Sequence, residues 1–448
     1  MLVGCMTPGA RSPAYLPDYA PSGTPAPYLP THGFGASSSE SEATGQAMGL
    51  GEVIRRSVAR DPRIKAALAE VEVAQAEYQA AAVLPNPGLS ISQTLMPFPG
   101  KPFTPELQGG PPQLDIGVSY TLDTILFGKR SSALESAQQA IDVAAAEYAE
   151  VVRQRVKEAV LAFYDVLQAE AVAALCQEAH EQVKKLEKIT EQRVTLGSVG
   201  SIEQDRVKLA VLSTHRELLR AETELIKART ALAARTGSQG SGAVRGSLEC
   251  PDPRAPPPLE VLLAQAEESR PDLLAARRKI RKAQMDLSTE RARGYPELTV
   301  SAGVTRQFQA RAIGMPDVSA WGVALETTLP IFDRNQGGVA RAEAVRRQSE
   351  AELAATILEA YAEIAQAHQE YSLAYTLMTS DDVETLRAAS NARDKIQESY
   401  KLGGRTLIEV LDAQEAYRQT VRLIIEARAN YWRALHLLNA AVGKRVLP

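Results

Sequence analysis

Apolar residues recur every seven positions along two very long segments that contain neither glycine nor proline. The first segment covers 68 residues, 129–196, and the second covers 64 residues, 339–402. A sustained heptad pattern predicts helices that supercoil against partner helices. At 1.5 Å per residue, each segment would form a helix about 100 Å long. The segments that follow continue the pattern, at Val211, Leu218, Leu225 and Leu232 and at Val410, Tyr417, Ile424, Tyr431 and Leu438.

Two pairs of shorter segments, 88–123 and 297–330, alternate apolar with small or polar residues, which predicts β-strands. Leu298 and Val300, for example, flank Thr299. Strands of about 9–11 residues are long enough for a tilted membrane crossing. Four strands cannot close a barrel, because the smallest bacterial barrels have about eight, and open edges in lipid leave backbone groups unsatisfied. The pattern predicts either a barrel shared among several chains or a half-buried sheet in a soluble protein.

The chain is a duplication. Gly197 and Gly403 each follow a leucine and lie 206 residues apart, and the same distance separates Gly237 from Gly443. Each half has a helix, a strand pair, a very long helix, a glycine-containing turn and a returning helix, so we expect a mainly α fold with a small β part. The predicted divisions are a tether (1–49), a first repeat (50–250, with strand pair 88–123, long helix 129–196 and returning helix 201–236), a proline-rich junction (251–258), a second repeat (259–443, with strand pair 297–330, long helix 337–402 and returning helix 405–442) and a tail (444–448).

Composition and spacing argue against several classes of function. The net charge is −4 with basic residues scattered among acidic ones, so the basic stripe of a nucleic-acid-binding protein is missing. No nucleophile, acid–base pair or metal-ligand cluster stands at catalytic spacing, and Cys176 and His180 are better explained as a chance pair on one helix face. The chain contains no run of 18 apolar residues, so the sequence predicts no transmembrane helix. We therefore expect no enzyme activity, no cofactor, no bound metal and no nucleic-acid partner.

The first residues contain a candidate lipid-anchor site. The sequence Leu2-Val3-Gly4-Cys5 matches a lipobox, in which the cysteine becomes the lipidated first residue of a bacterial lipoprotein. Residues 6–48 then supply seven prolines with many glycines and serines, a composition typical of an extended tether. Because a lipobox follows a basic and an apolar region, lipidation of Cys5 predicts an upstream signal sequence; a chance match is the alternative.

The duplicated hairpins and strand pairs together resemble the TolC-like outer membrane efflux proteins over residues 50–443. The resemblance implies a homotrimer with a twelve-stranded transmembrane barrel, four strands per chain, continued by a helical tunnel across the periplasm of a Gram-negative bacterium. Many members are lipoproteins, which favours lipidation of Cys5. The segments Phe-Gly-Lys-Arg (127–130) and Leu-Pro-Ile-Phe-Asp-Arg-Asn-Gln-Gly (329–337) look like the cobalt-zinc-cadmium resistance branch, which suggests metal-ion efflux by association.

The segment 400–413, Tyr-Lys-Leu-Gly-Gly-Arg-Thr-Leu-Ile-Glu-Val-Leu-Asp-Ala, is the part of the chain that matches this family best. In the family it forms the periplasmic tip, where three copies close an iris. Glu409 and Asp412 fall on positions of acids that line the constriction. Three residues apart, they share a helix face, and in a trimer they would form two acidic rings that attract cations. The alternative is a solvated coiled-coil face.

The same resemblance assigns three further residues to the gate. Arg405 and Tyr400 match positions whose hydrogen bonds hold the closed state, and Glu203 matches the acidic partner of that tyrosine. The residue before Glu203 is Ile202, where the family has a polar side chain, so the partner of Arg405 is left open.

The predicted function is a passive outer-membrane exit duct of a tripartite efflux system. Its partners would be outer-membrane lipid, an inner-membrane pump that supplies the energy, and a periplasmic adaptor that docks on the hairpin turns, where Gly197, Gly200, Gly403 and Gly404 permit tight geometry. A type I secretion channel, or a periplasmic coiled-coil adaptor or scaffold, is the alternative. Metal ions, drugs and proteins all remain open as cargo.

Overall fold

The computed structural model describes residues 47–96, 98–101, 104–105, 110–237, 242–380 and 382–447. Cys5 and nearly all of the predicted tether lie outside the described residues. The elements are α1 (Leu50–Arg60), α2 (Pro62–Ala82), β1 (Gly88–Thr94), β2 (Gln113–Thr121), α3 (Asp123–Leu126), α4 (Lys129–Thr195), α5 (Ser201–Thr236), α6 (Leu259–Ser269), α7 (Pro271–Arg293), β3 (Leu298–Gln307), α8 (Gln309–Ile313), β4 (Val318–Thr327), α9 (Gln336–Thr379), α10 (Asp382–Lys401) and α11 (Leu407–Val442).

Two compact units divide the chain, and each unit draws residues from both repeats. We call residues Lys65–Tyr148 and Asp272–Leu358 the strand unit. The described parts of Met1–Ile64, Ala149–Pro271 and Glu359–Pro448 form the turn unit. Each unit is described by itself below.

The two long helices differ from one another. Helix α4 is continuous for 67 residues, as its heptads predict. It also contains an 18-residue window that is apolar enough to cross a membrane by length and composition, contrary to our expectation, although core helices of soluble proteins meet the same criterion.

The prediction of one continuous helix over 337–402 is wrong, because α9 ends at Thr379 and α10 begins at Asp382. The Thr379 and Ser380 hydroxyls donate to the carbonyls of Tyr375 and Leu377, at 2.9 and 2.7 Å. Short polar side chains of this kind compete for backbone groups and favour helix ends over helix interiors.

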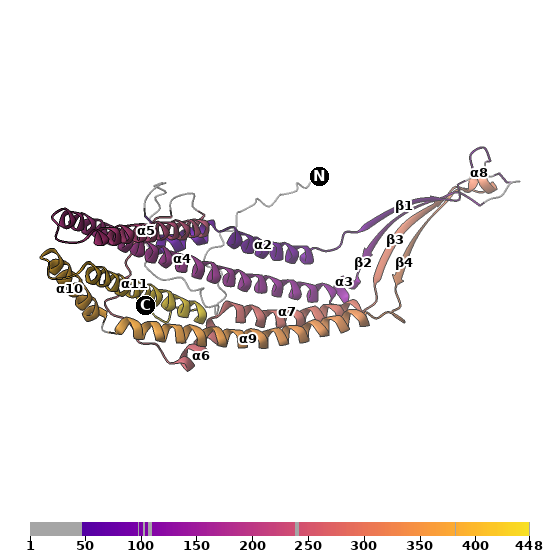
Figure 1. Ribbon diagram of the computed structural model, residues 1–448. Helices are drawn as coiled ribbons and strands as arrows, with labels where there is room; N and C mark the ends of the chain where they lie inside the picture. The colour runs from indigo at the N-terminus through magenta and orange to yellow at the C-terminus, as the bar shows by residue number, and fades with distance from the viewer. Residues whose placement is uncertain are drawn as a thin grey trace. The chain divides into compact units, whose positions relative to one another are not determined.

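One antiparallel sheet lies in the strand unit, and each strand pairs with the next along the chain in the order β1-β2-β3-β4 (Figure 1). The register confirms the predicted alternation and places the apolar residues on one face, with one row formed by Ile91, Ile116, Val304 and Trp321. The chain does not cover this face, since Trp321 is 80% exposed and Val323 is 64% exposed. Within the described residues, no strand pairs with the outer edge of β1 or of β4.

The opposite face of the sheet carries small and polar residues. The register aligns Gly117, Gly303 and Gly322 in one row with Ser90. A Cβ added to Gly303 would lie 2.9 Å from the Ile116 carbonyl oxygen, closer than real Cβ atoms approach, so β2 and β3 require a glycine there.

Each strand pair leads into its long helix through a residue with left-handed backbone geometry. In the first repeat this residue is Gly128, with φ +69°, and in the second it is Asn335, with φ +58°. The Asn335 Nδ2 atom donates to the carbonyl and to the carboxylate Oε2 of Glu290, at 2.8 and 2.7 Å. The ring of Phe127 stacks on Tyr295 with centroids 5.6 Å apart. Phe127 and Asn335 belong to the two motif segments, 127–130 and 329–337. These contacts explain what both residues do in the structure.

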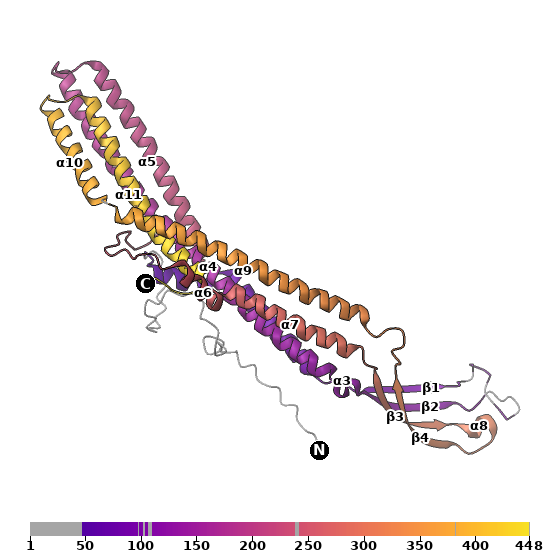
Figure 2. The same ribbon diagram turned by 90° about the horizontal axis from the view of Figure 1, so that it is seen from below.

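The turn unit holds two helical hairpins. Figure 2 shows the α4–α5 hairpin beside the α10–α11 hairpin, with both turns at the same end of the unit. Farther from the turns, α6, α9 and α11 enclose an apolar core that includes Leu262, Ile364, Tyr371, Tyr431 and Leu438.

Two buried arginines complete the C-terminal end of α11 in this unit. The Arg153 and Arg270 guanidinium groups and the Ser269 hydroxyl donate hydrogen bonds of 2.6 Å each to the backbone carbonyls of residues 440–442. Both arginines are only 3% exposed. These donors satisfy carbonyls that a helix end leaves unpaired, and positive charge is favourable at this end of the helix dipole. Arg270 also pairs with the Glu363 carboxylate at 2.8 Å.

Burial alone would raise the pKa of Glu363, but the charges of Arg270 and Arg153 and a hydrogen bond from Arg270 outweigh it, so the pKa is lowered. A carboxyl with a lowered native pKa stabilises the fold above its ordinary pKa of about 4.3. That contribution is lost as the pH falls through the native pKa.

We predict that Glu363→Gln destabilises the protein by about 1–2 kcal/mol at pH 7. This is less than the roughly 3–5 kcal/mol expected on breaking a fully buried pair, because Glu363 is 35% exposed. Thermal unfolding in detergent at pH 7 and at pH 3 tests this, with the exposed Glu359→Gln on the same helix as control. The difference between variant and parent should be smaller at pH 3 than at pH 7. A difference that is equally large at both pH values would contradict the assignment.

Candidate functional site at the hairpin turns

Glycines make both turns, but only one glycine in each needs left-handed geometry. Gly197 and Gly403 have φ of +68° and +82°. After them, the Ser198 N–H donates to the carbonyl of Arg193 at 2.8 Å, and the Gly404 N–H donates to that of Ser399 at 2.9 Å. Gly200 instead has extended geometry and precedes α5, with φ −77°.

Tyr400, on the last turn of α10, is 1% exposed and joins the two hairpins. Its hydroxyl lies 3.0 Å from the Thr190 Oγ1 atom of α4 and 3.5 Å from a carboxylate oxygen of Glu203. The predicted Glu203 contact is therefore present at the outer limit of a hydrogen bond, while Thr190 is the closer partner. Arg193 adds two contacts, because its Nη1 donates to the Tyr400 carbonyl at 2.9 Å and its guanidinium lies 4.6 Å from the ring centroid. We call Tyr400, Thr190, Glu203 and Arg193 the tyrosine node.

Arg405 does not contact the tyrosine node through any interaction found in the described residues, and its partner is Glu409. The Arg405 Nη1 donates to the Glu409 carboxylate at 2.7 Å. That carboxylate also accepts from the Thr406 N–H at 2.8 Å, and the Thr406 hydroxyl caps the N–H of Glu409 in return. This capping box fixes the start of α11. Hydrogen bonds from the Thr406 N–H, Arg405 and the Thr406 hydroxyl lower the pKa of Glu409.

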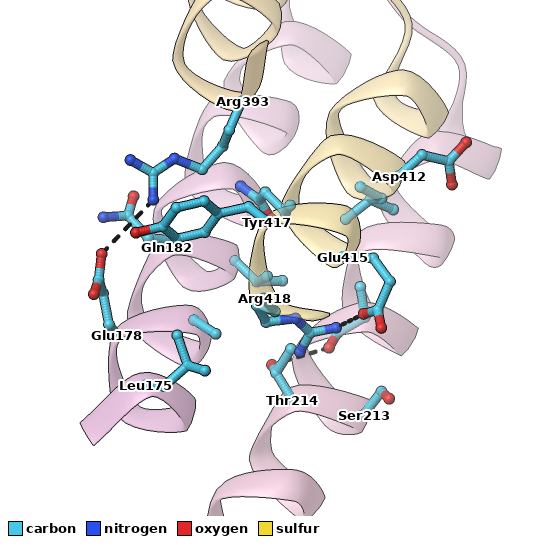
Figure 3. A pocket seen from close by; sticks show the side chains of 15 residues that line it. Leu175, Glu178, Gln182, Ser213, Thr214, Arg393, Asp412, Glu415, Tyr417 and Arg418 are labelled. Atoms are coloured by element: carbon cyan, nitrogen blue, oxygen red, sulfur yellow. Dashed lines mark hydrogen bonds and ion pairs between the residues drawn. The ribbon is translucent and has the colours of Figure 1, made fainter. Parts of the chain in front are cut away.

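Asp412 is exposed, three residues farther along α11, and no bond to its carboxylate is found in the described part of the chain. Figure 3 shows its carboxylate directed away from Arg418. The two acids of the predicted constriction therefore differ. The Glu409 carboxylate is bound by Arg405 and by the N–H of Thr406 at the start of α11. The Asp412 carboxylate makes no such contact among the described residues.

Two further ion pairs connect the hairpins farther from the turns. Arg418 of α11 donates to Glu217 of α5 at 2.8 Å. Arg393 of α10 lies over the Tyr417 ring, 4.0 Å from its centroid, and its Nη1 atom is 3.9 Å from the Glu178 carboxylate of α4 (Figure 3). A cavity of about 250 Å³ lies between these pairs, among α4, α5, α10 and α11.

Thr190, Arg193 and Thr406 are not among the site residues that the sequence predicts. The Thr-x-x-Glu pattern at 406–409 is a readable capping signature. No local pattern marks Thr190 or Arg193, because their roles depend on a residue more than 200 positions away.

The histidine that sequence paired with Cys176 makes a different contact. His180 is 5% exposed, and its Nδ1 atom lies 3.1 Å from the Thr214 hydroxyl. Across the described ranges, no group of three or more His, Cys, Asp or Glu side chains could hold a metal ion.

Similarity to known proteins extends over both repeats. The family model described as "Outer membrane efflux protein" matches residues 53–238 and 262–444. The cobalt-zinc-cadmium resistance protein CzcC of Cupriavidus metallidurans is 26% identical over 370 residues, which are 82% of each chain. The probable outer membrane lipoprotein SilC of Salmonella typhimurium is 25% identical and covers 84% of this chain and 81% of its own. The CmeC outer membrane channel of Campylobacter jejuni shares the fold, with a TM-score of 0.71 at 16% identity over 95% of this chain and 96% of that one.

Proposed function

The chain belongs to the outer membrane efflux protein family, and on this premise we propose that it is the outer-membrane exit duct of a tripartite efflux system, assembled as a homotrimer. This is a family of channels and not of enzymes. Energy would come from an inner-membrane pump, connected through a periplasmic adaptor.

The main support for this proposal is the apolar face of the sheet, which the chain leaves uncovered. A soluble protein rarely leaves a contiguous apolar face of this kind open to water, whereas an outer-membrane strand turns alternate apolar residues toward lipid. Lipid also forbids open strand edges. If β1 of one chain pairs with β4 of the next, three chains close a barrel of twelve strands, and every edge is paired.

Two substitutions at neighbouring positions of β4 distinguish a membrane barrel from a soluble sheet. Val323→Arg places a charge on the apolar face and should reduce barrel stability by about 2–4 kcal/mol if that face contacts lipid near the bilayer centre. Ala324→Arg, its control, places the same charge on the polar face and should be tolerated. The measurement is the amount of heat-modifiable trimer in outer-membrane fractions. A soluble monomer, or equal yields of both variants, would refute the membrane barrel.

The described arrangement of the hairpins supports a gate held closed by the tyrosine node. Three copies would bring three α10–α11 turns together, with Asp412 and Glu409 forming acidic rings at the aperture. Opening would separate α10 and α11 from α4 and α5, which breaks the contacts of Tyr400. Arg405 takes part indirectly in this account, through Glu409.

Acidic rings at the aperture should bind divalent cations and so block conduction. We predict that Glu409→Gln combined with Asp412→Asn reduces this block in planar bilayers. Asp412→Asn alone should give most of the effect, since the Glu409 charge is shared with Arg405. Glu426→Gln, about four turns farther along α11, serves as control. Unchanged block in the double variant would remove both acids from the gate.

We also propose metal cations as cargo. The support is the similarity to a cobalt-zinc-cadmium resistance protein together with the exposed Asp412 carboxylate, which no described residue binds.

The turns at Gly197–Gly200 and Gly403–Gly404 are the proposed adaptor surface. A leucine precedes each turn, and these two leucines, Leu196 and Leu402, are 78% and 83% exposed.

Lipidation of Cys5 completes the proposal. It is supported by the lipobox-like start and by the similarity to a probable outer membrane lipoprotein. Cells that express the gene with its natural upstream DNA should incorporate labelled palmitate into this protein, and Cys5→Ala should abolish the label. Labelling that survives Cys5→Ala, or that never occurs, would show the lipobox match to be accidental.

A further inference from the structure

One face of α11 packs against the neighbouring helices, and we call this packed face the seam. Near the gate the seam has one polar residue among apolar ones. In heptad positions along this seam, Leu407 and Val410 are each 1% exposed and Ile424 is 7% exposed. Gln414 occupies the position seven residues after Leu407 and is itself only 7% exposed. A polar side chain at a core position of a coiled coil reduces stability and instead specifies an arrangement.

The Gln414 amide has no hydrogen-bond partner in the part of the chain that the structure describes. Both its nitrogen and its oxygen are buried and unpaired. Nearly all buried polar groups in folded proteins are paired, because an unpaired one has lost its water without compensation. An unpaired amide therefore makes this arrangement of α11 less favourable than an apolar side chain would.

Packing around Gln414 is also incomplete. The residue lines the cavity between the hairpins, whose lining combines small or apolar side chains (Leu175, Ala179, Val183, Ala210 and Leu411) with polar and charged ones. A cavity of this kind forfeits contacts that a filled core would make. Gln414 thus combines an unpaired amide with loose packing.

Polar contacts hold the hairpins together on both sides of this weak point. The tyrosine node lies toward the turns. On the other side Arg418 binds Glu217. Toward the turns an apolar cluster also joins the hairpins, and it includes Leu186, Val207, Leu407 and Val410. The cavity at Gln414 therefore interrupts a seam that is otherwise packed.

We infer that Gln414 is a positioning residue for the gate, which weakens the seam so that α11 can leave α4 and α5. This inference rests on the proposed function. In the joined arrangement the amide is unpaired, and when the seam separates, water satisfies it. The residue thereby shifts the equilibrium toward the open channel without touching the cargo.

The test measures open probability of the full-length trimer in planar bilayers. Gln414→Leu restores an apolar heptad position, removes the unpaired amide and should lower the ratio of open to closed channels about tenfold. The conductance of a fully open channel should not change. Gln414→Glu has nearly the same shape but adds a buried charge, so it should raise the open fraction at neutral pH. Gln419→Leu, at an exposed glutamine of α11, is the matched control.

A second variant protects the test against misfolding. Ala210→Val adds volume to the same cavity from α5 and should also lower the open fraction. If the parent protein conducts and neither Gln414→Leu nor Ala210→Val lowers its open fraction, the inference is wrong. If the parent protein forms no channel, the proposed function fails first.

Discussion

A strand edge in lipid must be paired, and this constraint determines most of the assembly proposed here. The sheet has one apolar face that the chain leaves uncovered, together with two outer edges that no described strand pairs. Four strands are too few to close on themselves. The chain therefore requires copies of itself, and three copies would bring six helical hairpins to the assembly. The duplication matters because it gives each copy two hairpins, which the proposed gate would separate.

The contacts of α11 change along its length. Far from the turns, α11 is packed in an apolar core, and its last carbonyls are held by Arg153 and Arg270. Near the turns, an apolar cluster that includes Leu186, Leu407 and Val410 is combined with the polar contacts of Tyr400. Local opening is drawn from the least stable parts of a protein. The position of Gln414, where a cavity and an unpaired amide interrupt the packing, is such a part, and it lies beside the proposed gate.

Sequence patterns predicted what depends on local periodicity. Helix α4 was predicted to within one residue of its end, because heptads run through it without interruption. The break after Thr379 was missed, since no glycine or proline marks it. Contacts between distant segments could not be predicted, so Thr190 and Arg193 were missed, as was the alignment of Gly117 with Gly303. Gln414 lies in the heptad row of Leu407, where a polar residue does not fit the apolar periodicity and so gives no signal of its own.

The most direct test of the central claim is a cryo-electron microscopy map of the full-length protein in lipid nanodiscs. The account predicts three copies whose strands form one barrel, with β1 of each chain paired to β4 of the next and with Trp321 facing lipid. A map of single chains outside the bilayer, or one in which water surrounds the apolar face of the sheet, would contradict it.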